Sequence, residues 1–213
     1  MCPARTPSLT NMNLYQKYIL PRLLNASMRR GEIEKSRPGV VGQAMGTVLE
    51  VGFGSGLNLP HYKNVLKLYA LDPSSELYNL AEKRIKEASF PVEYIKASAE
   101  EIPLAENTID TVVSTWSVCS IPRPELALKE IFRVLKPGGK FIFIEHGKSP
   151  GRFTAKWQKW LTPIFGCVSG GCHMDREVDK LISRAGFKIT DLETFPQKLR
   201  PLLFMYKGVA LKK

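Results

Sequence analysis

The sequence contains no apolar run of 18 residues, so we expect no transmembrane helix. The N-terminal stretch MCPARTPSLTNMN lacks the apolar core of a secretory signal peptide, and we expect a cytoplasmic protein. Cysteine is scarce: the four cysteines are scattered along the chain and suggest no compact disulfide framework. Internal repeats and low-complexity segments are also absent, which argues against a repeat architecture and against a disordered chain.

Acidic residues are fewer than basic ones, with 20 Asp and Glu against 31 Lys and Arg, and the formal net charge is +11. This excess favours anionic partners such as an acidic membrane surface, nucleic acid or an anionic substrate, whereas a solvated basic surface is the simpler interpretation. No recognised nucleic-acid-binding module accompanies the charge, so we expect no nucleic-acid partner. The 213 residues, 44% of them hydrophobic, are enough for one domain with a sizeable core.

A β-branched and apolar run at residues 47–51 leads directly into three alternate glycines, Gly52, Gly54 and Gly56. The run predicts a buried strand, and the glycines allow a sharp turn in which a ligand can lie against the main chain. A second predicted strand, residues 66–71, ends in Asp72, whose carboxylate can accept hydrogen bonds from ribose hydroxyls. The glycine spacing differs from the G-x-G-x-x-G of dinucleotide-binding folds, so a different nucleotide ligand is indicated.

These residues, together with the acidic loop at 97–104 and the segment 110–141, resemble the class I S-adenosylmethionine (SAM) methyltransferases. The resemblance implies a Rossmann-like α/β fold: a seven-stranded, mostly parallel sheet with an antiparallel terminal strand and helices on both faces. It implies SAM as the cofactor and S-adenosylhomocysteine as the product. The implied cofactor-binding residues are Glu50, Gly52, Gly54, Gly56, Asp72, Pro73, Ser98, Ala99, Glu100 and Thr115, with Ser98 where the family usually has Asp.

We expect one methyltransferase domain over residues 1–213, with an N-terminal helical lid at 12–45 and an inserted acceptor-side segment at 147–175. The lid comprises a helix over 13–30, kinked or divided at Pro21, and a polar connector over 31–45. Further strands are predicted at 91–97, 109–115 and 140–145, with a terminal antiparallel pair at 187–195 and 202–211. Helices are predicted from 73 onward, at 125–135, at 148–165 and at 178–186.

Three segments differ from the general pattern: TWSVCSI at 115–121, IEH at 144–146 and GGCHMDRE at 170–177. Together with an insertion that carries two tryptophans, they resemble the methyltransferase-like thiol S-methyltransferase family, whose mammalian members methylate alkyl thiols and hydrogen sulfide. The implied function is methylation of a small thiol or hydrosulfide. Two alternatives stay open: a lipid-headgroup N-methyltransferase or quinone C-methyltransferase at a membrane surface, and a SAM-binding protein without catalysis.

The three segments should meet at the edge of the sheet where parallel strands end. His146 and His173 are candidate general bases, with structural roles as the alternative for each. We expect a small-molecule acceptor, and we favour the tryptophan insertion as a roof over an apolar pocket, with weak contact of the insertion with a membrane surface as the alternative. The candidate acceptor-pocket residues are Tyr15, Tyr18, Cys119, Glu145, Trp157, Cys172 and Arg176.

A metal site is not expected from the cysteine spacing. Zinc sites usually combine paired C-x₂₋₄-C units, whereas Cys167, Cys172 and His173 form one isolated C-x₄-C with an adjacent histidine. Cys119 is interpreted as a packed core thiol, with arsenic binding or a redox role as alternatives.

Overall fold

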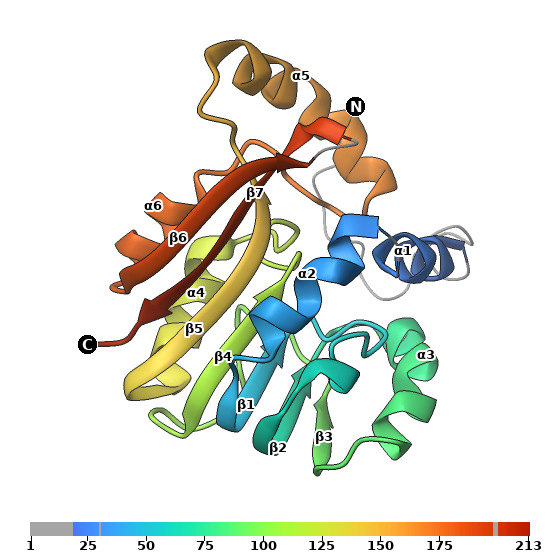
Figure 1. Ribbon diagram of the computed structural model, residues 1–213, viewed down its shortest axis with the longest axis vertical. Coiled ribbons are helices and arrows are strands. Elements are labelled where there is room, and N and C mark those ends of the chain that lie inside the picture. The colour runs from blue at the N-terminus through green and yellow to red at the C-terminus, as the bar shows by residue number, and fades with distance from the viewer. Residues whose placement is uncertain (1–18, 30, 198–199) are drawn as a thin grey trace.

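The structure is a computed structural model that describes residues 19–29, 31–197 and 200–213 (Figure 1). Its centre is a seven-stranded sheet in the order β3-β2-β1-β4-β5-β7-β6. Four neighbouring pairs are parallel, and β7 runs antiparallel to both β5 and β6. The predicted Rossmann-like fold with an antiparallel terminal strand is therefore confirmed. The strands are β1 Met45–Val51, β2 Asn64–Leu71, β3 Val92–Ile95, β4 Ile109–Thr115, β5 Leu135–Gly147, β6 Lys188–Gln197 and β7 Arg200–Leu211.

The sheet is buried on both faces, as the continuous apolar runs of its central strands predict. In β5, Phe141 and Phe143 pack into one hydrophobic core, while the alternating Ile142 and Ile144 pack into the other. Because successive side chains of a strand point to opposite faces, such a run needs helices on both sides. The helices are α1 Leu20–Met28, α2 Gly31–Val41, α3 Ser75–Lys86, α4 Pro124–Val134, α5 Arg152–Val168 and α6 Val178–Arg184, with a short 3₁₀ helix at Leu59–His61.

The two faces are covered by different helices (Figure 1). Val40 and Val41 of α2 and Ala81 of α3 belong to one core. Residues of α4 and α6, such as Leu128 and Ile182, belong to the other. Both groups of helices leave the carboxyl ends of β1, β2, β4 and β5 accessible to a ligand, which is where open α/β sheets bind one.

One segment differs from the prediction: residues 31–45 were expected to be a polar connector, but α2 occupies Gly31–Val41. Two acidic side chains, Glu32 and Glu34, lie in its first turn, where the helix dipole favours negative charge. Its other side is buried through Arg37, Val40 and Val41. The polar segment is therefore a helix, and Arg37 is its one buried charged residue.

The inserted segment contains α5, which stands away from the sheet at the upper end of Figure 1. Gln158 anchors it: its Nε2 donates to the carbonyls of Gly147 (3.0 Å) and Leu202 (2.9 Å), and its Oε1 accepts from the Ser149 amide (2.8 Å). This side chain is fully buried. At the other end of the chain, α1 is the described part of the predicted 13–30 helix, and Pro21 lies in its first turn.

Candidate active site

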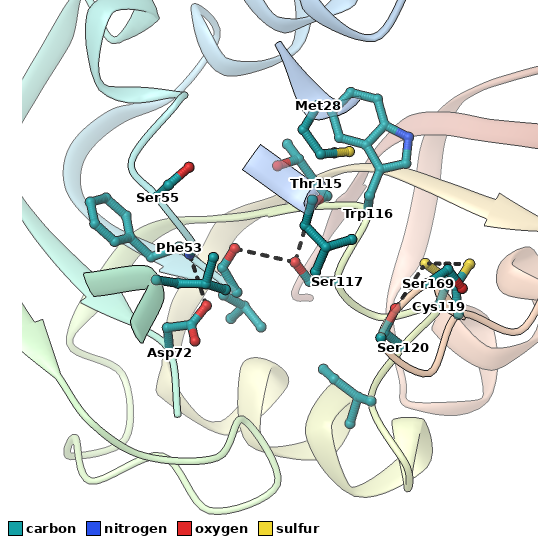
Figure 2. A pocket seen from close by; sticks show the side chains of 18 of the residues that line it. Met28, Phe53, Ser55, Asp72, Thr115, Trp116, Ser117, Cys119, Ser120 and Ser169 are labelled. Carbon is teal, nitrogen blue, oxygen red and sulfur yellow. Dashed lines mark hydrogen bonds between the residues drawn. The ribbon is translucent and has the colours of Figure 1, made fainter. Parts of the chain in front are cut away.

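A cavity of about 620 Å³ opens at the carboxyl ends of the parallel strands. Figure 2 shows Asp72, Phe53 and Ser55 on one side of it and Cys119, Ser120 and Ser169 on the other, with Thr115 and Ser117 between them. Helix α1 contributes lining residues from Leu23 to Met28, and the end of α5 contributes Phe165 and Val168. The cavity therefore joins the glycine loop to residues of the segments 115–121, 144–146 and 170–177.

The three glycines after β1 all have positive φ but do different things. A Cβ on Gly52 would lie 2.0 Å from Ser117 Oγ, so this position needs glycine for packing as well as for its backbone. The space beside Gly54 is open, with no atom closer than 3.9 Å, and Gly54 lines the cavity. Gly56 packs against Phe53 and lies outside the cavity lining among the described residues. Gly54 is thus the position where a ligand can lie against the main chain.

Asp72 is buried beside this loop, at the end of β2. Its Oδ2 accepts from the Gly54 amide and its Oδ1 from the Ser74 amide, both at 2.8 Å. Burial raises the pKa of Asp72, and these two hydrogen bonds oppose the rise. Each oxygen keeps a lone pair for a further donor, so the carboxylate can hold the loop and accept ribose hydroxyls at the same time.

Glu50 forms the floor of the same side of the cavity. Tyr62 donates to its Oε2 at 2.7 Å and Asn58 to its Oε1 at 2.8 Å. Burial raises the pKa of Glu50 to about 7, partly offset by these hydrogen bonds and by the nearby charge of Arg37. The Asn58 amide also reaches Thr115 Oγ1 at 3.0 Å, which ties β1 to the end of β4.

Arg37 and Trp116 are two of the cavity residues that were not predicted as site residues from the sequence. Arg37 of α2 is buried, donates to Asn58 and to the Met28 carbonyl, and forms an ion pair with Glu34 at 3.3 Å. Burial lowers its pKa. Its guanidinium lies 5.1 Å from the ring centroid of Trp116, which has φ of +54°. Such a backbone is unusual for a bulky residue and typical of functional sites. The one sequence signal was the position of Trp116 directly after a strand.

The acidic loop after β3 contributes Ser98 and Ala99 to the lining, and Pro73 joins them from the turn after β2. Ser98 Oγ accepts from the Glu100 amide at 3.2 Å. The Glu100 side chain turns to Arg123, whose Nε donates to it at 2.8 Å, so among the described residues it does not line the cavity. Glu100 therefore fixes the loop onto the start of α4 instead of facing a ligand.

The opposite end of the cavity is formed by Cys119, His146 and Cys172, all three buried. The two sulfurs lie 3.5 Å apart, and His146 Nδ1 lies 3.4 Å from Cys172 Sγ and 3.9 Å from Cys119 Sγ. The contact with Cys172, together with burial, raises the pKa of the Cys119 thiol. The three sequence segments expected at one edge of the sheet thus meet there.

Glu145 and Arg176, expected in the acceptor pocket, lie behind this cluster and do not line the cavity among the described residues. Glu145 is fully buried and accepts hydrogen bonds from Ser114 Oγ and from the amides of residues 117–119. Arg176 donates to the Val118 carbonyl, and burial lowers its pKa. The two charges hold the loop that carries Trp116 and Cys119.

Two further candidates are placed elsewhere. The His173 side chain is 48% exposed, beside Asp175 at 3.8 Å, and only its backbone amide reaches the site, through Cys119 O at 2.8 Å. Burial of part of the ring lowers its pKa. Trp157 is exposed on the outer side of α5, because the buried Gln158 fixes the opposite side to β5 and β7. Tyr15 and Tyr18 lie outside the described residues.

Comparisons with known proteins agree with this geometry. A family profile described as "Methyltransferase domain" matches residues 49–143. The human thiol S-methyltransferase TMT1B is 31% identical over 87% of this chain and 80% of its own length. The rat thiol S-methyltransferase TMT1B is 36% identical over 70% of this chain, and the match spans 63% of that protein, less than two thirds of it.

Solved structures support the fold in the same way. A SAM-dependent methyltransferase from Aquifex aeolicus superposes with a TM-score of 0.65 over 91% of this chain and 98% of its own, at 22% identity. In the described residues, no helix is long and apolar enough to cross a membrane. The chain belongs to the family of SAM-dependent methyltransferases that includes the thiol S-methyltransferases TMT1A and TMT1B.

Proposed function

We propose that this methyltransferase transfers a methyl group to the sulfur of a small apolar thiol or of hydrosulfide. The observation that carries the proposal is the character of the cavity's far end, beyond the glycine loop. Its walls are mostly apolar, and its polar side chains are two thiols, one imidazole and the hydroxyls of Ser120 and Ser169. Among the described lining residues, the carboxylates are Glu50 and Asp72, which both lie beside the glycine loop. The resemblance to TMT1A and TMT1B supports the same acceptor class.

The open space at Gly54 and the buried carboxylate of Asp72 fit SAM. SAM would lie against the main chain at Gly54, and its ribose hydroxyls would donate to Asp72. SAM supplies an activated methyl group on a cationic sulfur when it is bound. The chain's part is to align the acceptor with that methyl group and to exclude water, through Leu24 and Met28 of α1 above the cavity. Ser55 Oγ donates to Asn25 at 2.7 Å and fastens α1 to the glycine loop.

A thiol acceptor needs little help from a base, because the thiolate is the nucleophile and the reference thiol pKa is about 8.5. An amine or a quinol would need a committed base near the acceptor. Among the described residues, His146 is the imidazole at the acceptor end of the cavity. We retain it as the side chain that contacts the acceptor sulfur. His173, with its exposed ring, is not proposed for this role.

The test is incubation of the purified protein with isotope-labelled SAM and a panel of acceptors, followed by mass spectrometry of the products. The panel contains alkyl thiols, hydrosulfide, phosphatidylethanolamine vesicles and a quinol. We expect S-methylated products whose rate of formation rises with pH as the acceptor ionises, and product formation at least about tenfold slower from the Asp72→Ala control at a limiting SAM concentration. Methylation of the lipid or the quinol alone would replace the thiol proposal. SAM binding without any product would identify a binding protein.

A further inference from the structure

The cluster of Cys119, His146 and Cys172 is assembled from three separate parts of the chain. Cys119 lies in the loop after β4, His146 is the penultimate residue of β5, and Cys172 follows α5. All three line the cavity, and each is at least nine-tenths buried, with exposures of 1%, 7% and 4%. Their ligand atoms, two sulfurs and one ring nitrogen, all lie within 4.8 Å of one another.

The cluster is held more firmly than packing alone requires. The Glu145 carboxylate accepts from the Cys119 amide at 3.1 Å, and the Cys119 carbonyl accepts from the His173 amide at 2.8 Å. The first contact ties Cys119 to the strand that carries His146, and the second ties it to the segment that carries Cys172. Backbone bonds of this kind keep the three side chains in fixed positions before any ligand arrives.

The three side chains form only weak hydrogen bonds with one another. Thiols are weak hydrogen-bond donors and acceptors, and each contact in the cluster is longer than an ordinary hydrogen bond between nitrogen and oxygen. His146 Nε2 is buried and has no hydrogen-bond partner among the described residues. The fold therefore brings together three good metal ligands that gain little from each other.

The distances match a metal centre. A tetrahedral Zn²⁺, with Zn–S of about 2.3 Å and Zn–N of about 2.0–2.1 Å, places its ligand atoms about 3.5–3.8 Å apart. The three observed separations are 3.5, 3.4 and 3.9 Å. We propose that Cys119, His146 and Cys172 bind a thiophilic divalent metal ion, with Zn²⁺ as the best-fitting ion, and leave its fourth position open to the cavity. Two thiolates and one imidazole with an open position are a known catalytic zinc arrangement.

The open position gives this site a role in the reaction, and this part rests on the proposed thiol methylation. The acceptor sulfur binds the metal and releases its proton to solvent. A lone pair of the acceptor sulfur then forms the new S–CH₃ bond. At the same time the bond between the methyl group and the SAM sulfur breaks, and its electron pair stays on the SAM sulfur. The metal ion thus presents the acceptor as a thiolate at a pH where the free thiol is mostly protonated.

The binding test uses Co²⁺, whose colour reports thiolate ligands. The reduced, metal-free full-length protein is titrated with Co²⁺ and then with Zn²⁺. We expect a thiolate-to-cobalt charge-transfer band, and its loss when one equivalent of Zn²⁺ per chain is added. The Cys119→Ser and Cys172→Ser double variant should lose the band, and His146→Gln should bind at least ~100-fold more weakly, because even outer partners of metal ligands contribute about 10–100-fold.

Matched controls are Cys167→Ser, an exposed residue of α5, and His61→Gln, which contacts Glu34 away from the cavity. Both should keep the band, and circular dichroism should show that every variant is folded. Absence of the band, or an unchanged band in His146→Gln, would overturn the metal site. If the protein binds no metal but methylates thiols, the metal inference fails and the proposed function stands. If it binds the metal and methylates no thiol, the site stands and its role toward the acceptor fails.

Discussion

At the residue scale, the glycine loop offers a comparison that separates a ligand clash from backbone strain. Gly54 and Gly138 both have positive φ, and a Cβ would meet no close atom at either position. An alanine at either position should therefore cost about 1 kcal/mol of stability. Gly54 lines the cavity, whereas Gly138 lies in β5, where its amide contacts Lys212.

We predict that Gly54→Ala weakens SAM binding at least about tenfold and that Gly138→Ala leaves it unchanged. Asp72→Ala should also weaken binding about tenfold or more, since charge-assisted hydrogen bonds contribute about 1.5–3 kcal/mol each. The exposed Asp191→Ala is its control. Titration calorimetry measures all four variants. Equal SAM affinity in Gly54→Ala, Asp72→Ala and the wild-type protein would contradict the cofactor site.

The raised pKa of Glu50 predicts how the free energy of unfolding changes with pH. Its pKa is raised from 4.5 to about 7 in the fold, so between these values the folded chain holds a proton that the unfolded chain has lost. Stability falls with pH wherever the folded state binds more protons. Each pKa unit corresponds to about 1.4 kcal/mol, so Glu50 should lower the free energy of unfolding by roughly 3 kcal/mol as the pH rises across this window.

The measurement is urea unfolding of wild type and Glu50→Gln at several pH values from about 5 to about 8. Glutamine keeps an oxygen that can accept from Tyr62 but has no proton to lose. The difference in stability between the two proteins should shift in favour of the variant as the pH rises. A difference that does not depend on pH would show that Glu50 is ionised throughout.

At the element scale, α5 presents an apolar and basic face to solvent. Phe153 is 76% and Trp160 68% exposed, and their rings both lie against Trp157. Lys156 and Lys159 are also exposed on this helix. The sequence favoured a roof over the acceptor above a membrane-facing helix, but among the described residues only the end of α5 lines the cavity. Aromatic rings with lysines between them suit the interface of an anionic bilayer.

We therefore predict that the protein co-sediments with vesicles rich in anionic lipid and is released as the salt concentration rises. The double variant Trp157→Gln and Trp160→Gln should bind these vesicles much less. Leu66→Ser, which removes an apolar side chain 75% exposed on β2, serves as the control for lost surface hydrophobicity. Equal sedimentation of the three proteins would remove α5 from consideration as a membrane contact.

The attachment of α5 makes a separate prediction about stability. Gln158→Ala would leave one buried carbonyl, one half-buried carbonyl and one buried amide without this partner. Unpaired buried groups cost about 1–3 kcal/mol each, so we expect a loss of at least about 2 kcal/mol in the free energy of unfolding. Gln43→Ala, an exposed glutamine at the end of α2, should change it by less than about 0.5 kcal/mol. Chemical denaturation of both variants measures the contrast, and similar losses would contradict the anchoring role.

At the scale of the whole molecule, the sequence predicted the residues that directly follow a strand. It did not predict contacts between residues that lie far apart in the chain. The glycine loop and Asp72 follow strands directly, so their position at the sheet edge could be inferred. The same reasoning brought Cys119, His146 and Cys172 to that edge. It could not show that they would lie at metal-ligand distances, because zinc motifs are recognised by spacing and these ligands lie far apart in the chain. Arg37 was not predicted, because nothing in the polar segment 31–45 indicates which of its charged side chains is buried.

The net charge of +11 supplies a last prediction, which also acts over the whole molecule. A positive field raises the encounter rate of anions and lowers that of cations, and salt screens it over about 10 Å at 0.1 M ionic strength. If the acceptor is a thiol, kcat/KM should be higher for 3-mercaptopropionate than for the cationic 2-aminoethanethiol, with neutral 2-mercaptoethanol between them. Raising the salt concentration should bring the three values together. A preference that salt leaves unchanged would mean that contacts within the cavity, such as that with Arg37, select the acceptor instead.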